Sequence, residues 1–250
     1  MLVDPATVAR AVPGTLEVLA SILPDGWSQE RDGVVTVVTG LPVPTLNGVW
    51  ALDTAVAPAE LAAALRRLAS RGVPFCLQAR PGCVTAAVAA ADPLALTPAA
   101  AEIPLMVLDG PLGAAGASKL TIRPLGLADS GLHGALAGQA FAADAEIFDR
   151  VTDPALALPG ARVYVGEVAG EPVTTALAVT VGDAVAVFNV ATPPEHRGRG
   201  YGAAITGRIL NDALAAGAGW AWLQATPDGA GIYERLGFRT VESWACWLSD

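Results

Sequence analysis

The chain has 250 residues, of which 53% are hydrophobic and 16% are charged, and its formal net charge is −9. This composition excludes a disordered chain, which needs low hydrophobicity and high charge, and the acidic balance argues against nucleic-acid binding, which needs a cationic surface. No apolar stretch approaches the roughly 20 residues of a membrane helix. The first residues lack the basic and apolar segments of a signal peptide, so we expect a cytoplasmic protein without a membrane partner.

The potential metal ligands are few and scattered. The three cysteines, Cys76, Cys83 and Cys246, show neither disulfide nor zinc spacing, and His133 and His196 lie far apart in the sequence. The sequence therefore predicts no metal site.

The first half of the chain contains a strand–helix–strand pattern. A strand is predicted at Val49–Leu52, and an amphipathic helix carries Leu61, Leu65 and Leu68 at helical spacing. A second strand is predicted at Val73–Cys76.

A segment rich in proline, glycine and alanine follows and has no hydrophobic period. We interpret residues 111–118 as a linker that divides the chain into domains at 1–110 and 119–250, both of ordinary domain size.

The second half is predicted to be an α+β domain. Its largely antiparallel sheet becomes parallel only where a helix crosses over, and helices flank it. The predicted elements are a strand at Leu120–Leu125, helices at Asp129–Phe141 and Glu146–Asp149, a hairpin of Arg162–Val168 and Pro172–Thr180, a strand at Ala184–Val190, a helix after residue 203, a strand at Trp220–Gln224, a short helix through Tyr233 and a last strand at Phe238–Leu248.

The two halves share a pattern. The segment that begins at Leu77 is similar to the one that begins at Leu223, 146 residues later, whereas the preceding strands at Val49 and Val187 lie 138 residues apart. The first copy is therefore about eight residues shorter, and the missing part corresponds to a glycine-rich loop of the second copy. Chance similarity between two alanine-rich units is the alternative.

That loop, residues 192–203, is suited to an anion. Gly198, Gly200 and Gly202 allow close approach of the backbone to a ligand, and the free N–H groups and dipole of the following helix favour phosphate. Arg197 and Arg199 add positive charge. The segment has neither the G-x-G-x-x-G order of a dinucleotide fingerprint nor the lysine of a nucleotide P-loop.

The loop resembles the acyl-CoA loop of the GNAT superfamily of N-acyltransferases, (Q/R)-x-x-G-x-(G/A), with Arg197, Gly200 and Gly202 at the defined positions. Residues 233–238, Tyr-Glu-Arg-Leu-Gly-Phe, are similar to a second element of that family, and Ile122–Leu125 looks like its first strand. The resemblance covers about 119–250. The first half resembles a degenerate GNAT lobe, as in tandem proteins similar to mycothiol synthase.

The resemblance implies a GNAT-like fold, preceded by a degenerate lobe, and acetyl-CoA as the acyl donor. In the family, the strand before the loop splays from its neighbour and pairs with pantetheine, which implies that role for Val190 and Thr192. Tyr233 would protonate the leaving sulfur. The residues that would hold the pyrophosphate are Arg197, Gly198, Arg199, Gly200, Tyr201, Gly202 and Ala203.

The general base and the acceptor are less defined. Many family members place a glutamate on the strand before the loop, but Ala184–Val190 has no carboxylate. Glu146 and Glu167 are candidates for the general base by their position around the acceptor cleft of the family, and water could serve as the base instead. Asn189, Glu146 and Gln224 are our candidates for contacts with the amine. The leading hypothesis is an N-acetyltransferase acting on an amine. The alternatives are a non-catalytic acyl-CoA-binding or regulatory protein and a purely structural two-lobed protein. The sequence does not determine the acceptor or the oligomeric state.

Overall fold

The computed structural model describes residues 2–114, 116, 119–227 and 229–249. The chain forms two compact units that are not continuous in sequence. The C-terminal unit contains residues 106–223 and the stretch that ends at Arg239, and the N-terminal unit contains residues 4–105, 224–227 and the stretch from Thr240 onward. None of the helices that the structure describes has the length and apolar character needed to cross a membrane.

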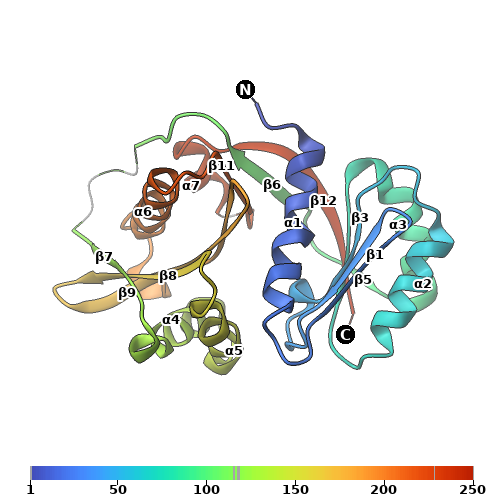
Figure 1. Cartoon of the computed structure of the whole chain (residues 1–250), viewed down its shortest axis with the longest axis horizontal. Helices are drawn as coiled ribbons and strands as arrows, with labels where there is room; N and C mark the ends of the chain where they lie inside the picture. The colour runs from blue at the N-terminus through green and yellow to red at the C-terminus, as the bar shows by residue number, and fades with distance from the viewer. Residues whose placement is uncertain (1, 115, 117–118, 228, 250) are drawn as a thin grey trace. The chain divides into compact units, whose positions relative to one another are not determined.

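The N-terminal unit is built on five strands in the order β1-β2-β3-β4-β12, and β5 pairs with β12. Strands β3 and β4 are parallel, and the other pairs are antiparallel. Figure 1 shows α1 on one side of these strands and α2 and α3 on the other. The elements are α1 (Pro5–Ala20), β1 (Trp27–Arg31), β2 (Val34–Val38), β3 (Gly48–Ala51), α2 (Pro58–Ala69), β4 (Cys76–Ala79), α3 (Val84–Ala91), β5 (Thr97–Pro98) and β12 (Arg239–Leu248), with β6 (Ile103–Leu108) at the unit boundary.

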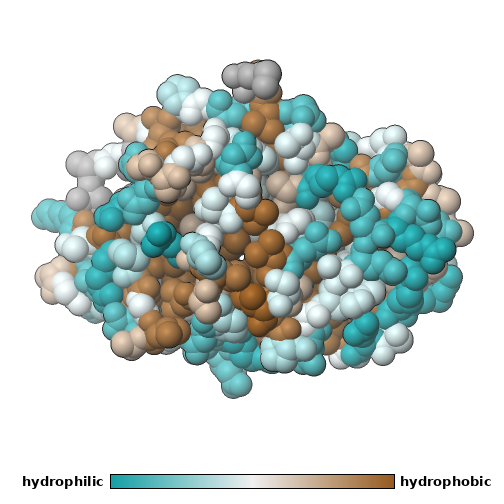
Figure 2. Space-filling model, in the orientation of Figure 1, coloured by the Kyte–Doolittle hydropathy of each residue, from teal (hydrophilic) through white to brown (hydrophobic). Residues whose placement is uncertain are grey.

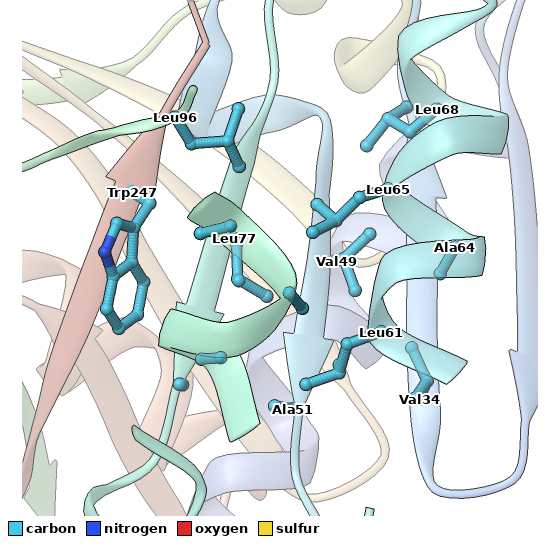
Figure 3. Packing of buried hydrophobic residues seen from close by; sticks show 14 of the residues in the cluster. Val34, Val49, Ala51, Leu61, Ala64, Leu65, Leu68, Leu77, Leu96 and Trp247 are labelled. Atoms are coloured by element: carbon cyan, nitrogen blue, oxygen red, sulfur yellow. The ribbon is translucent and has the colours of Figure 1, made fainter. Parts of the chain in front are cut away.

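The core of this unit lies between α2 and the strands. Leu61, Leu65 and Leu68 lie along one face of α2 and are fully buried against β2, β3 and β4 (Figure 3). Burial of each such leucine contributes about 1.5–3 kcal/mol. Trp247 of β12 belongs to the same cluster. The last strand of the chain is therefore part of the N-terminal core.

The C-terminal unit has the strand order β7-β8-β9-β10-β11, antiparallel except for the parallel pair of β10 and β11. Helix α6 makes the crossover between that pair. Figure 1 shows α4 and α5 on one side of the sheet and α6 and α7 on the other. The elements are β7 (Thr121–Pro124), α4 (Gly131–Phe141), α5 (Ala145–Leu156), β8 (Ala161–Val168), β9 (Glu171–Val181), β10 (Ala184–Ala191), α6 (Tyr201–Ala215), β11 (Trp220–Gln224) and α7 (Ala230–Arg235).

The predicted fold class is confirmed: both units have a mixed, mostly antiparallel sheet flanked by helices. The hairpin between β8 and β9 turns at Ala169 and Gly170, both with positive φ, as the right-handed twist of paired strands favours.

Two predicted elements were wrong. The strand predicted at Val73–Cys76 instead begins at Cys76, because Pro74 has no N–H to donate to a ladder and its carbonyl accepts a hydrogen bond from the Asn47 side chain. The helix predicted at Glu146–Asp149 extends to Leu156, since Pro154 lies near its end and leaves the earlier turns intact.

The predicted linker includes residues 115, 117 and 118, which lie outside the described residues, so the division at 111–118 stays a prediction. The compact units differ from that continuous division because β12 pairs with β4, from Ala245 opposite Ala79 to Leu248 opposite Cys76.

Candidate functional site

Strands β10 and β11 separate before the glycine-rich loop. Their parallel register runs from Ala184 opposite Trp220 to Ala186 opposite Trp222 and covers no later residue of β10. On the other side of β10, Phe188 faces Leu177 and Ala191 faces Thr175. Three steps on β10 thus match two on β9, which defines a β-bulge with one extra residue.

The bulge is centred on Asn189, whose φ is +49°. Asparagine tolerates this left-handed conformation better than most residues. A bulged residue is left unpaired in the ladder with β9. Because the register with β11 ends at Ala186, the end of β10 also has backbone groups free to bind a ligand on the β11 side. Asn189 and Val190, both predicted site residues, lie in this opening.

The loop after β10 leads into α6 with its N–H groups free. Gly198 and Gly200 have φ of +75° and +77°, and an added Cβ at either would meet nothing within 4 Å. The first helical hydrogen bond is donated by the Ala204 N–H to the Gly200 carbonyl. Over the part of the chain that the structure describes, the six N–H groups of 198–203 have no hydrogen-bond partner. This is the arrangement that helix N-termini use to bind phosphate.

The side chains of both arginines in the loop stabilise its conformation through hydrogen bonds to backbone carbonyls. Arg197 donates from Nε to the Thr192 carbonyl at 3.0 Å and from Nη2 to the Ala140 carbonyl at 2.7 Å. Arg199 donates from Nη2 to the Glu195 carbonyl at 3.1 Å. The side chains therefore fix the loop shape while their charges remain beside the free N–H groups.

A buried threonine that the sequence analysis did not single out anchors the start of the loop. The Thr174 hydroxyl donates to the Ala191 carbonyl and lies 2.9 Å from the Thr192 hydroxyl. Threonine is common in strands, so no sequence signal distinguished this one. The Thr192 side chain is thereby oriented from β9.

Tyr233 lies on α7, which contacts the first turn of α6. A Cβ added to Gly202 would lie 3.9 Å from Cδ1 of Ile232, the residue before Tyr233. The Tyr233 ring meets Phe238 edge to face at 5.9 Å, and burial raises the pKa of its phenol to about 12. The hydroxyl therefore stays protonated over the ordinary pH range, as a proton donor requires.

The candidate carboxylates and amides are placed differently. Glu167 is paired with Arg123 at 2.9 Å, and Arg123 also pairs with Asp129. Glu146 is exposed at the start of α5. Gln224 belongs to the N-terminal unit, where its amide donates to Gln78 at 2.7 Å. Their roles toward an acceptor stay predictions.

The sequence analysis did not predict a structural role for the buried side chain of His133. His133 on α4 is 1% exposed, and its Nδ1 lies 2.8 Å from the Thr175 hydroxyl. Thr175 uses its single hydroxyl proton to donate to the Tyr164 carbonyl, so it must accept from His133. Nδ1 therefore carries the proton, and burial lowers the pKa of the ring to about 4.

The related part of the N-terminal unit has no such opening. Strands β3 and β4 pair from Gly48 opposite Cys76 to Ala51 opposite Ala79. The contact between the two segments continues beyond this register. The backbone N–H of Arg80 donates to the Ala51 carbonyl, and the Nη1 of the Arg80 side chain donates to the Leu52 carbonyl. The Arg80 guanidinium is held there by Glu242 of β12 at 2.9 Å.

Comparison with known proteins defines the class of the C-terminal segment. Residues 159–240 match the family model described as the acetyltransferase (GNAT) domain. The match spans β8 to α7 and includes the bulge, the loop and Tyr233. The resemblance identified from the sequence is confirmed: this segment is a GNAT acetyltransferase domain.

The whole chain resembles solved structures of the same class. A GCN5-related N-acetyltransferase from Kribbella flavida superposes with a TM-score of 0.73 at 22% identity, covering 99% of this chain and 96% of that one. A GCN5-related N-acetyltransferase from Sphaerobacter thermophilus gives 0.61 at 16% identity, with 88% and 81% covered. A tandem GNAT protein from the clavulanic acid biosynthesis pathway gives 0.59 at 13% identity, with 94% and 87% covered. At these identities the likeness concerns the fold. A comparison with curated protein sequences finds no significant match.

Proposed function

We propose that the protein is an N-acetyltransferase that moves an acetyl group from acetyl-CoA to an amine by direct attack in a ternary complex. The observation that carries this proposal is the set of free N–H groups at 198–203, next to the separation of β10 from β11. The open space at Gly198 and Gly200 fits a pyrophosphate, because a backbone without side chains allows close approach. Val190 and Thr192 would lie along the pantetheine arm.

The chemistry requires a neutral amine, a donor for the oxyanion and a proton for the leaving thiolate. The amine nitrogen attacks the thioester carbonyl carbon, and the C–S bond breaks as the tetrahedral intermediate collapses. Tyr233 would give its proton to the sulfur, and a backbone N–H freed at the Asn189 bulge would stabilise the oxyanion. The proton lost by the amine would pass to water, since β10 has no carboxylate, and water would return a proton to the Tyr233 phenolate.

The missing carboxylate also supports a second candidate, a non-catalytic acyl-CoA-binding or regulatory protein. Release of CoA thiol from acetyl-CoA with a panel of amines separates the two, because only a transferase releases thiol in an amine-dependent manner. No release with any amine, together with measurable acetyl-CoA binding, would favour the regulatory protein.

The loop assignment has a matched test. Gly200→Glu places a carboxylate at the proposed phosphate site and should abolish acetyl-CoA binding in a calorimetric titration. Gly182→Glu is the control, because Gly182 also has positive φ (+62°) and open space around an added Cβ but lies in the β9–β10 turn. Each change carries a similar left-handed backbone cost of about 1–2 kcal/mol. Equal acetyl-CoA affinity in the two variants would overturn the assignment.

A further inference from the structure

The segment that follows β6 lies against the end of α7, and both belong to the C-terminal unit. We call residues 109–113 of this segment the strap, and Figure 1 shows it passing close to α7. The Gly113 N–H donates to the Leu236 carbonyl at 2.9 Å. A Cβ added to Gly113 would clash with the Arg235 carbonyl oxygen and would lie 3.0 Å from the Leu236 carbonyl carbon. This close approach of two backbones therefore requires a glycine at position 113.

The strap makes two more contacts just after α7. Gly237 has a φ of +96°, and a Cβ added there would lie 2.9 Å from the Pro111 carbonyl oxygen. Arg239 donates from Nη2 to the Asp109 carboxylate at 2.6 Å, and that carboxylate also accepts the Val3 N–H at 2.7 Å. The hydrogen bond from Arg239 lowers the pKa of Asp109, so the carboxylate stays charged at neutral pH. The strap is thus fixed to the chain at both of its ends.

The turn that the strap contacts also supports Tyr233. The Tyr233 carbonyl accepts the N–H groups of Leu236 and Phe238, each at 3.0 Å, and the Tyr233 ring meets Phe238 edge to face. Leu236 and Phe238 are buried, and Figure 2 shows apolar side chains at the surface around α6 and α7. Helix α7 has only six residues, and a helix this short is stabilised by tertiary contacts rather than by its own hydrogen bonds. The position of Tyr233 therefore depends on what holds residues 235–239.

We propose that the strap sets the position of the Tyr233 hydroxyl, and that Gly113 and Asp109 are positioning residues for proton transfer to the leaving sulfur. The inference rests on the proposed function, in which Tyr233 is the proton donor. In that step the phenol O–H bond breaks, an S–H bond forms, and water returns a proton to the phenolate. A proton donor must lie within hydrogen-bond reach of the atom that it protonates. A shift of α7 by about 1 Å is therefore enough to slow the step.

Two matched glycine variants test the role of the strap. Gly113→Ala forces the strap and the end of α7 apart and should lower kcat roughly 10–10²-fold. The acetyl-CoA Kd should change little, because the N–H groups of 198–203 belong to the loop and α6. Gly160→Ala is the control, because its Cβ would lie 2.5 Å from the Thr180 carbonyl oxygen. Thr180 pairs with Val185, at the end of β10 opposite to the loop, so this variant should keep the wild-type kcat.

A double-mutant cycle distinguishes positioning from general destabilisation. Gly113→Ala should have almost no further effect on kcat in a Tyr233→Phe background, because the group that it displaces is already absent. Asp109→Asn weakens the pairing with Arg239 without adding an atom, and it should give the same pattern with a smaller loss. This second variant applies the same test if Gly113→Ala does not fold.

NMR of the tyrosine rings gives a reading that needs no turnover. The Tyr233 signals, identified by their loss in Tyr233→Phe, should shift in Gly113→Ala and stay in place in Gly160→Ala. Unchanged Tyr233 signals in Gly113→Ala would overturn the inference whatever the activity. Equal losses of kcat in the two glycine variants, additive effects in the cycle, or a wild-type kcat in Tyr233→Phe would overturn it and leave the transferase standing. Selective shifts of Tyr233 without thiol release from the wild type would support the hold of the strap on the ring and refute the transferase.

Discussion

His133 should make the folded protein sensitive to mild acid. Its ring is neutral in the fold, with a pKa lowered from 6.5 to about 4 by burial. The unfolded chain binds a proton at the ordinary pKa, so between these two values it holds more protons than the folded chain. The stabilising contribution is therefore complete above about pH 6.5 and is lost as the pH falls toward 4.

The size of the effect follows from the shift. This lowering of the His133 pKa contributes about 3 kcal/mol to the free energy of unfolding at neutral pH. About 2 kcal/mol of that contribution is lost at pH 5. His133→Asn is the informative change, because its side-chain amide can still donate to Thr175 but cannot titrate. The variant starts from lower stability, since it leaves a cavity. Its further loss of stability between pH 7.5 and pH 5 should be smaller than that of the wild type by about 2 kcal/mol.

Urea unfolding of both proteins at the two pH values measures this difference. The contributions of other ionisable groups, such as Asp149, whose pKa burial raises, are common to both proteins and cancel in the comparison. NMR titration of the His133 ring gives a second reading, because its signals should stay constant from pH 8 to pH 5. Equal pH dependence in the two proteins, with a ring that titrates near 6.5, would refute the reasoning.

Three further predictions concern the site and its support. Tyr233→Phe should lower kcat by roughly 10–10³-fold with little change in acetyl-CoA affinity; an unchanged rate would mean that water protonates the sulfur. Calorimetry should give one acetyl-CoA per chain, because β3 and β4 stay paired through Ala51 and Ala79; a stoichiometry of two would contradict this. Gly134→Ala should destabilise by about 1–3 kcal/mol in urea unfolding, because its Cβ would lie 2.8 Å from the backbone carbonyl oxygen of Ala145 and would also clash with Asp149 Oδ1. Gly131→Ala on the same helix meets nothing within 4 Å and is the control; equal losses would exclude a steric cause.

The sequence determined the features that depend on neighbouring residues. The glycine-rich loop and the helix after it could be predicted, because glycine conformation and helix dipoles act within a few residues. The hairpin of Arg162–Val168 and Pro172–Thr180 could be predicted for the same reason. Alternation and helical spacing gave most elements of the second half, and with them the fold class.

Only the tertiary structure decided which distant residues meet. The residues around Trp247 do not indicate that the last strand completes the N-terminal core. A strand pattern specifies which face of the strand is buried, but not which strand it pairs with. Nor does the sequence show that Thr174 anchors the loop, that Arg197 holds the end of α4, or that Gly113 contacts the end of α7. These features depend on contacts between residues far apart in the chain, and the proposals for the position of Tyr233 and the acid response rest on such contacts.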